Sequence, residues 1–233
     1  MYSTHWKSIE MTKNGFTFIT IHPAAKLLPG VWNPYNYKYC EKEDSRPFSD
    51  FAEIQKVNRK KIDVKHFEYA PIEYKHIPKG DLLTFTLEEK SENLKGKYSY
   101  VIENTLLFGT MRAYLGNACI TPYGEWITKT RNLKFAVNSE FSAIFPFDNF
   151  KYFWWAYVKS FNFLKEMPTG SGGTRPRVSS ELLSEVRVNV PSKIERQIIN
   201  ETLKSIAQAS WANYIEGKNV LKNLQKEYPE TYE

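Results

Sequence analysis

Three residues, Asp81, Glu88 and Lys90, have types and a spacing that could support metal chemistry. An Asp followed by Glu-x-Lys is typical of metal-dependent nucleases, in which carboxylates hold Mg²⁺ beside a lysine. The chain contains 32 basic and 26 acidic residues, so chance alone readily produces this pattern. Glu88 also runs directly into the polar segment 89–93, which is typical of a solvated turn. A Mg²⁺-dependent nuclease is therefore an alternative and not the main interpretation.

The segment 33–36, Asn-Pro-Tyr-Asn, is similar to the Asn-Pro-Pro-Tyr loop with which DNA amino-methyltransferases hold the target nitrogen. The second proline is missing, and no glycine-rich turn between a strand and a helix is available to bind a methyl donor. The segment 170–173 lacks the lysine of a phosphate-binding loop, and a loop that needs positive φ explains its glycines more simply. The histidines show no metal-ligand or triad spacing: His5, His22, His66 and His76. We therefore expect no cofactor, no metal and no catalytic activity.

Positive charge is concentrated in the first four fifths of the chain. The formal net charge is +6, and residues 192–233 contain equal numbers of basic and acidic residues, so the whole excess falls within 1–191. A basic folded part joined to a neutral tail is typical of a protein that binds a polyanion with the first and other proteins with the second. The same charge could serve solubility alone, so charge by itself leaves both interpretations open.

The two cysteines, Cys40 and Cys119, predict neither a disulfide framework nor a metal site. Residues 1–6 contain no apolar stretch of the signal-peptide type. The longest aromatic run, 152–158, is far shorter than the roughly 20 residues that span a bilayer. We expect a cytoplasmic protein without a membrane segment.

Alternation of apolar and polar residues predicts a β-rich region up to residue 145. Turn formers separate the expected strands, which are 16–21, 82–87, 98–103, 106–111, 118–121, 126–128 and 142–145. One or two helical turns are expected within 47–54, beginning at Ser49. The aromatic segment 149–164 is expected to be a largely buried helix, because its aromatic residues occupy more than one face.

After the glycine-rich loop the sequence predicts a short helix capped by Ser179 or Ser180, and then a closing strand at 186–190. From 192 to about 228 apolar residues recur near the helical period, and a capping-box pattern stands at its start. Such a helix would be roughly 55 Å long at 1.5 Å per residue, although Gly217 could bend it. The predicted fold class is α+β, with a β-rich domain at 1–191 and a helical arm at 192–233.

Two segments of the chain resemble type I restriction-modification specificity subunits. The first, 101–117, contains a strand followed by Arg112 and a Leu-Gly turn. The second begins at the Gly/Thr-rich loop at 170 and runs through a short helix and an apolar strand ending at Pro191 into the long helix. Order and spacing match over residues 47–228. The chain departs from the family pattern in its single Pro191, where Pro-Pro is frequent, and in having Arg196 before Gln197, where Glu-Gln is frequent.

The resemblance implies a target-recognition domain that reads one half of a split double-stranded DNA site, and a helix that sets the distance between the halves. It also implies DNA methyltransferase (modification) subunits as partners, with or without a restriction subunit. Typical members carry two recognition domains and two helices, whereas this chain has one of each. We therefore expect a homodimer with isologous symmetry, formed by a coiled coil of the helices, or pairing with another specificity chain. The expected interface residues are Ile199, Leu203, Ile206, Trp211 and Leu221.

The basic residues expected to contact DNA lie in or beside turns and in one basic cluster: Lys60, Lys61, Arg112, Lys129, Arg131, Arg175 and Arg177. Arg175 and Arg177 stand out because the neighbouring glycines would let the backbone approach a phosphate closely. Each of these residues could instead be a solvated charge. The competing function is a protein-interaction module, whose helix binds a partner while the basic domain has no role on nucleic acid.

Overall fold

The computed structural model describes residues 45–57, 67, 69–78, 85–88, 98–128 and 133–229. Several sequence-based predictions fall outside these ranges and stay predictions. They concern the strand at 16–21, the segment 33–36, the pair Asp81 and Lys90, and the basic residues Lys60, Lys61, Lys129 and Arg131.

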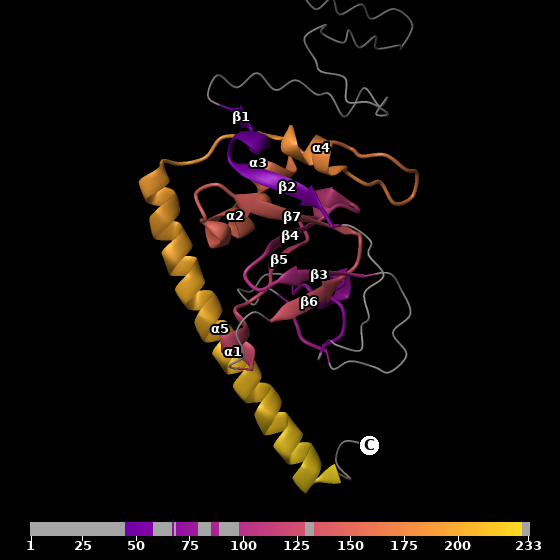
Figure 1. Cartoon of the computed structure of the whole chain (residues 1–233), viewed down its shortest axis with the longest axis vertical. Helices are drawn as coiled ribbons and strands as arrows, with labels where there is room; N and C mark the ends of the chain where they lie inside the picture. The colour runs from indigo at the N-terminus through magenta and orange to yellow at the C-terminus, as the bar shows by residue number, and fades with distance from the viewer. Residues whose placement is uncertain are drawn as a thin grey trace, which may run out of the picture.

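An antiparallel sheet of four strands forms the centre of the described part (Figure 1). Its order is β2 (Ala52–Lys56), β7 (Phe141–Pro146), β4 (Leu106–Gly109) and β5 (Ala118–Ile120). Along β4, Leu106 and Phe108 belong to one apolar cluster and Leu107 to another. Both faces of the sheet are therefore covered, which explains why this strand is a continuous apolar run.

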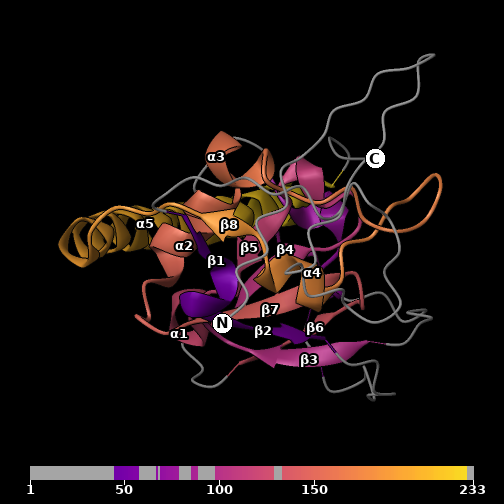
Figure 2. The same ribbon diagram turned by 90° about the horizontal axis from the view of Figure 1, so that it is seen from above.

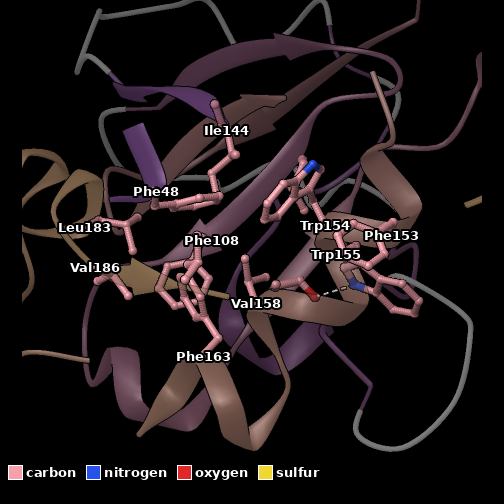
Figure 3. Packing of buried hydrophobic residues seen from close by; sticks show 14 of the residues in the cluster. Phe48, Phe108, Ile144, Phe153, Trp154, Trp155, Val158, Phe163, Leu183 and Val186 are labelled. Atoms are coloured by element: carbon pink, nitrogen blue, oxygen red, sulfur yellow. Dashed lines mark hydrogen bonds between the residues drawn. The ribbon is translucent and has the colours of Figure 1, made fainter. Parts of the chain in front are cut away.

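Helices and a short strand pair cover the first face. They are α2 (Lys151–Val158), α3 (Phe161–Leu164), α4 (Ser180–Ser184) and the ladder of β1 (Arg46–Pro47) with β8 (Arg187–Val188). Figure 3 shows Phe48, Trp154 and Phe163 close to Phe108 of the sheet, and all four rings are buried. Rings of this size dominate the burial energy of the domain, and their tilted and edge-on contacts are the favoured arrangement.

The second face is covered by β3 (Ser99–Ile102) paired with β6 (Lys134–Val137), together with residues around Ile72 and Phe85. The ring of Phe85 lies 5.7 Å from Phe135 and 5.3 Å from Trp211, both edge-on. Trp211 belongs to the C-terminal helix, so this helix completes the core on this side.

The C-terminal helix α5 (Lys193–Glu227) contains 35 residues and continues through Gly217 without a break. The capping box predicted at its start is confirmed: Ser192 Oγ accepts from the Glu195 amide at 3.4 Å, and the Glu195 carboxylate accepts from the Ser192 amide at 2.9 Å. At 1.5 Å per residue the helix is about 52 Å long. Figure 1 shows it lying along one side of the domain, with its C-terminal end extending beyond it.

Polar side chains of α5 fasten the helix to the domain. Asn200 Oδ1 accepts from the amides of Tyr152 and Phe153 at 2.9 and 3.3 Å, at the first turn of α2. Fourteen residues later, Tyr214 Oη accepts from the Leu87 amide at 2.9 Å and donates to the Leu87 carbonyl at 3.2 Å. Lys218 Nζ donates to that same carbonyl at 2.7 Å.

The structure corrects one of the predicted interface residues, Trp211, and covers part of the surface of another, Leu203, whose place at an interface stays a prediction. Trp211 was expected between two helices, but its side chain is fully buried within its own chain. Leu203 is half-buried against α2 and its neighbours in the first apolar cluster. Helical periodicity identifies residues that share a face, and this face of α5 is covered by the domain instead of by a partner.

Several predicted elements also differ. The strand expected at 126–128 is part of a helix, α1 (Gly124–Ile127), whose first amide is capped by the Glu103 carboxylate at 2.7 Å. The helix expected within 47–54 is a 3₁₀ turn at Phe48–Asp50 followed by strand β2. The single helix expected at 149–164 is divided into α2 and α3, because Ser160 caps a new helix. Residues 85–87, expected to end the strand at 82–87, form no strand.

Candidate nucleic-acid interface

The loop between α3 and α4 projects from the domain on the side away from the start of α5 (Figures 1 and 2). Its base is closed by a pair of backbone hydrogen bonds: Ser171 donates to the Arg177 carbonyl at 2.9 Å, and Arg177 donates to the Ser171 carbonyl at 2.8 Å. Gly170 stands beside this pair with φ +78°, and a Cβ there would meet the Arg177 carbonyl oxygen at 2.7 Å. The glycine is therefore required for the loop to close.

The loop is seated on the residues that follow β4. The Arg112 amide donates to the Pro176 carbonyl at 2.8 Å, and the Val178 amide donates to the Thr110 carbonyl at 3.0 Å. The Arg112 guanidinium also contacts the Thr174 carbonyl at 3.4 Å. The two segments that carry the family resemblance, more than 50 residues apart in the sequence, thus form one surface.

Arg112 itself has a left-handed backbone, with φ 49°, at the start of the short 3₁₀ helix Ala113–Leu115. Non-glycine residues adopt this region at a cost, and such strain is usually held in place at functional sites. The turn exposes Tyr114 and Leu115 by about half of their surface. A phenol and an apolar side chain are therefore exposed directly after the arginine that contacts the projecting loop.

The three arginines brought together here differ in their surroundings. In the described part of the chain, the exposed Arg175 side chain has neither a hydrogen-bond nor an ion-pair partner. Arg177 forms an ion pair with Glu140 at 3.1 Å, and Arg112 braces the loop backbone. Arg175 is consequently the arginine whose charge is most fully available to a ligand.

A partly buried tyrosine, Tyr74, fixes the turn that carries Glu140. Tyr74 Oη donates to the Glu140 carbonyl at 2.8 Å and accepts from the Met111 amide at 3.1 Å. Burial raises the pKa of Tyr74 well above the ordinary value of a phenol, so the group stays protonated and keeps donating. Its ring lies so close to Gly109 that a Cβ at that position would meet it at 2.3 Å. Sequence reasoning missed Tyr74 and Glu140, because their contact joins residues 66 positions apart.

Two hollows flank Arg177. The larger, of about 510 Å³, lies between the loop and the end of β2, and the smaller, of about 400 Å³, lies over the turn that precedes β7. The larger is rich in hydroxyl groups and includes one further cation, Lys56. The serines and threonine lining it are Thr110, Ser139, Ser142, Ser171, Ser179 and Ser180. Such a surface offers hydrogen-bond donors and acceptors together with positive charge.

The other basic residues expected at DNA, Lys60, Lys61, Lys129 and Arg131, lie outside the described residues and stay predictions.

Glu88, which belongs to the sequence pattern of the alternative nuclease function, has other partners in the structure. Glu88 Oε2 lies 3.0 Å from His76 Nε2 and 3.1 Å from Lys75 Nζ. Hydrogen bonds from His76 and then from Lys75 lower the pKa of Glu88. Among the described residues, no group of three or more His, Cys, Asp or Glu side chains is arranged to hold a metal ion.

The face of α5 that points away from the domain carries a row of apolar side chains, here called the outer stripe: Ile194, Ile198, Ile199, Ile206, Val220 and Leu221, all exposed by at least 40%. Three of them, Ile199, Ile206 and Leu221, were expected at a helix interface. Sequence reasoning missed the other three, because it did not separate the buried face from the open one. No helix in the described part of the chain is both long and apolar enough to cross a membrane.

The family model described as "Type I restriction modification DNA specificity domain" matches residues 41–219. No curated protein matches the chain. One similar solved chain belongs to a structure described as showing complex assembly and conformational transition of the type I R-M system. It is 16% identical with a TM-score of 0.42, over 89% of this chain and 46% of that one. Another is the HsdS subunit from Thermoanaerobacter tengcongensis, 16% identical with a TM-score of 0.40, over 84% of this chain and 42% of that one. The chain spans less than half the length of both, and likenesses at this level carry no functional argument.

Proposed function

This chain belongs to the family of type I restriction modification DNA specificity domains, and from that premise we propose that it reads one half of a split DNA site for a restriction-modification complex. The family assigns the chain to the specificity component and not to a catalytic one. Its partners would be double-stranded DNA, methyltransferase (modification) subunits and, where present, a restriction subunit. A role on DNA would place the chain in the cytoplasm.

The observation that carries this proposal is the seated loop with its unpaired arginine. A protein that reads DNA needs cationic groups on phosphates for register and a rigid support behind them. Arg175 supplies an available charge at the tip of a loop, and Arg112 and Gly170 hold that loop in place. Lys56 at the end of β2 extends the positive surface along the larger hollow.

Salt dependence of binding to mixed-sequence duplex DNA tests the proposal. Each phosphate contact releases counterions, so the affinity falls as salt is added. Removal of one contact should make the plot of log K against log salt less steep by about one unit. We expect Arg175→Ala to weaken binding to all sequences equally and to lower the slope by about that amount. Lys165→Ala is a matched control, because Lys165 is also an exposed cation but lines a different pocket, beside Arg187.

The competing function, a protein-interaction module, makes the opposite prediction. Such a chain would bind duplex DNA weakly and without steep salt dependence, and Arg175→Ala would change nothing. That result would indicate that the chain functions through protein contacts of α5 and not through DNA binding.

We also propose that the outer stripe of α5 pairs with the α5 helix of a second copy. Ile199, Ile206 and Val220 fall on one heptad row, with Asn213 at the remaining position of that row. A row of β-branched residues with a single Asn is typical of a paired helix, in which the polar residue specifies register. An exposed apolar row of this length is uncommon on soluble monomers. The pair would hold two recognition domains at a fixed separation.

A further inference from the structure

Glu140 is an acidic residue in the middle of the surface that we propose for DNA. A carboxylate there repels phosphates, so its presence needs a separate explanation. It lines the smaller hollow, and Arg177 lies between that hollow and the larger one. The inference below rests on the proposed DNA-binding function.

The backbone at Glu140 is held more firmly than a surface turn requires. Its carbonyl accepts three hydrogen bonds, from the Thr110 amide at 2.8 Å, from Thr110 Oγ1 at 2.9 Å and from Tyr74 Oη at 2.8 Å. Its amide donates to Asn138 Oδ1 at 3.0 Å. The backbone from which the Glu140 side chain projects is therefore fixed by its neighbours, and the Arg177 ion pair holds the side chain itself, as the reading of a base edge demands.

The ion pair between Glu140 and Arg177 involves only one oxygen of the carboxylate and one nitrogen of the guanidinium. Arg177 Nη2 contacts Glu140 Oε1 at 3.1 Å. Among the described residues, the second carboxylate oxygen, Oε2, and the remaining guanidinium N–H groups have no hydrogen-bond partner. The Arg177 side chain is 46% exposed and that of Glu140 is 22% exposed. The pair thus presents donors and an acceptor side by side, open toward the solvent.

We propose that Glu140 and Arg177 together read one G·C base pair in the major groove. Guanine presents two acceptors there, O6 and N7, and the paired cytosine presents the N4 amino donor beside them. Arginine is the usual partner of the guanine acceptors, and a carboxylate is the usual partner of the cytosine amino group. A phosphate offers acceptors only, so it would be complementary to Arg177 but not to Glu140. Arg175, which has no carboxylate beside it, supplies the phosphate contact.

Selection from a randomised duplex DNA pool by the full chain tests this assignment. Glu140→Gln keeps the size of the side chain and removes its charge, and a glutamine amide pairs with adenine N6 and N7 instead of with cytosine N4. We expect one G·C position of the selected sequence to lose its preference by about tenfold or more and to accept adenine, while the other positions stay unchanged. Arg177→Lys, which keeps the charge but loses the planar fork, should relax the same position.

Glu181→Gln is the matched control, because Glu181 lines the larger hollow together with Arg177 and its exposed carboxylate has the same charge. Both substitutions remove a negative charge and should slightly raise affinity for non-specific duplex DNA, but only Glu140→Gln should change the sequence selected. If Glu140→Gln selects the sequence of the unsubstituted chain, Glu140 is only a counter-ion of Arg177 and the inference is wrong, while the proposed function stands. If the unsubstituted chain selects no sequence at all, the proposed function itself fails, and the inference fails with it.

Discussion

Asn200 shows how one side chain can join two helices that are distant in sequence. The first amides of a helix have no partner within the helix and need an acceptor from outside. In α2 a residue of α5 supplies it, because Asn200 Oδ1 accepts from the amides of Tyr152 and Phe153. Asn200 itself is buried, at 4% exposure, so water cannot replace it.

We expect Asn200→Ala to lower the free energy of unfolding by about 1–3 kcal/mol, because two buried amides lose their acceptor. Urea denaturation followed by tryptophan fluorescence measures this loss. Asn200→Asp keeps the acceptor and places a negative charge at the helix N-terminus, so it should recover most of the stability. Asn219→Ala, an exposed position on the same helix, is the control and should change stability little. Equal stability for Asn200→Ala and Asn219→Ala would contradict a capping role.

At the level of elements, local sequence signals predicted those structures that depend on near neighbours. The cap of α4 by Ser179 and the capping box of α5 were both predicted and are present. Strands β4 and β5 fall within the ranges expected for them. The helix at Gly124–Ile127 was missed, because its capping carboxylate comes from Glu103, a residue 21 positions earlier.

The sequence indicated only part of the candidate site, again because the other contacts join residues that are far apart in the sequence. Arg112, Arg175 and Arg177 could be brought together by the order of the family segments. Glu140 and Tyr74 could not, because nothing in their local sequence indicates that one lies against the other. The sequence also did not indicate which face of α5 packs against the domain, because periodicity does not say what covers a face.

Truncation of α5 tests the role of the helix as part of the core. A chain ending at Pro191 loses Asn200, Ala207 and Trp211, all of which are buried against the domain. Removal of a buried tryptophan alone costs about 3–5 kcal/mol, a large share of the roughly 5–15 kcal/mol that stabilises a typical domain. The sequence predicted a domain at 1–191 and an arm at 192–233, whereas Ala207 and Trp211 of α5 pack within the two apolar clusters of that domain.

We therefore expect the chain ending at Pro191 to show no cooperative thermal transition by near-ultraviolet circular dichroism. A chain ending at Lys222 is the matched control, because it retains the contacts of Asn200, Trp211, Tyr214 and Lys218 with the domain. It should melt close to the temperature of the full chain. A cooperative transition at an unchanged temperature for the shorter chain would show that α5 only lies on the surface.

At the scale of the whole molecule, α5 can set the distance between two half-sites only if it joins two recognition surfaces. The described chain places the projecting loop on one side of the domain and α5 on the other (Figure 2). Because α5 is fixed to the domain at Asn200 and again at Tyr214, pairing of two α5 helices would fix the positions of both loops. The separation of the half-sites on DNA would then follow from the register of the helix pair.

The last prediction concerns this pairing. Ile199→Lys with Ile206→Lys places two charges in the outer stripe, at positions exposed by 40% and 42%, so folding should be preserved while pairing is lost. Light scattering should report a dimer for the full chain and a monomer for the double variant. Binding to a duplex with two half-sites should weaken, because the second contact is no longer intramolecular, while binding to one half-site should change little. Gln197→Lys with Gln208→Lys, two exposed positions of α5 outside the outer stripe, controls for added charge. A full chain that is monomeric at tens of micromolar would exclude the homodimer and leave a partner helix from another protein as the remaining occupant of the stripe.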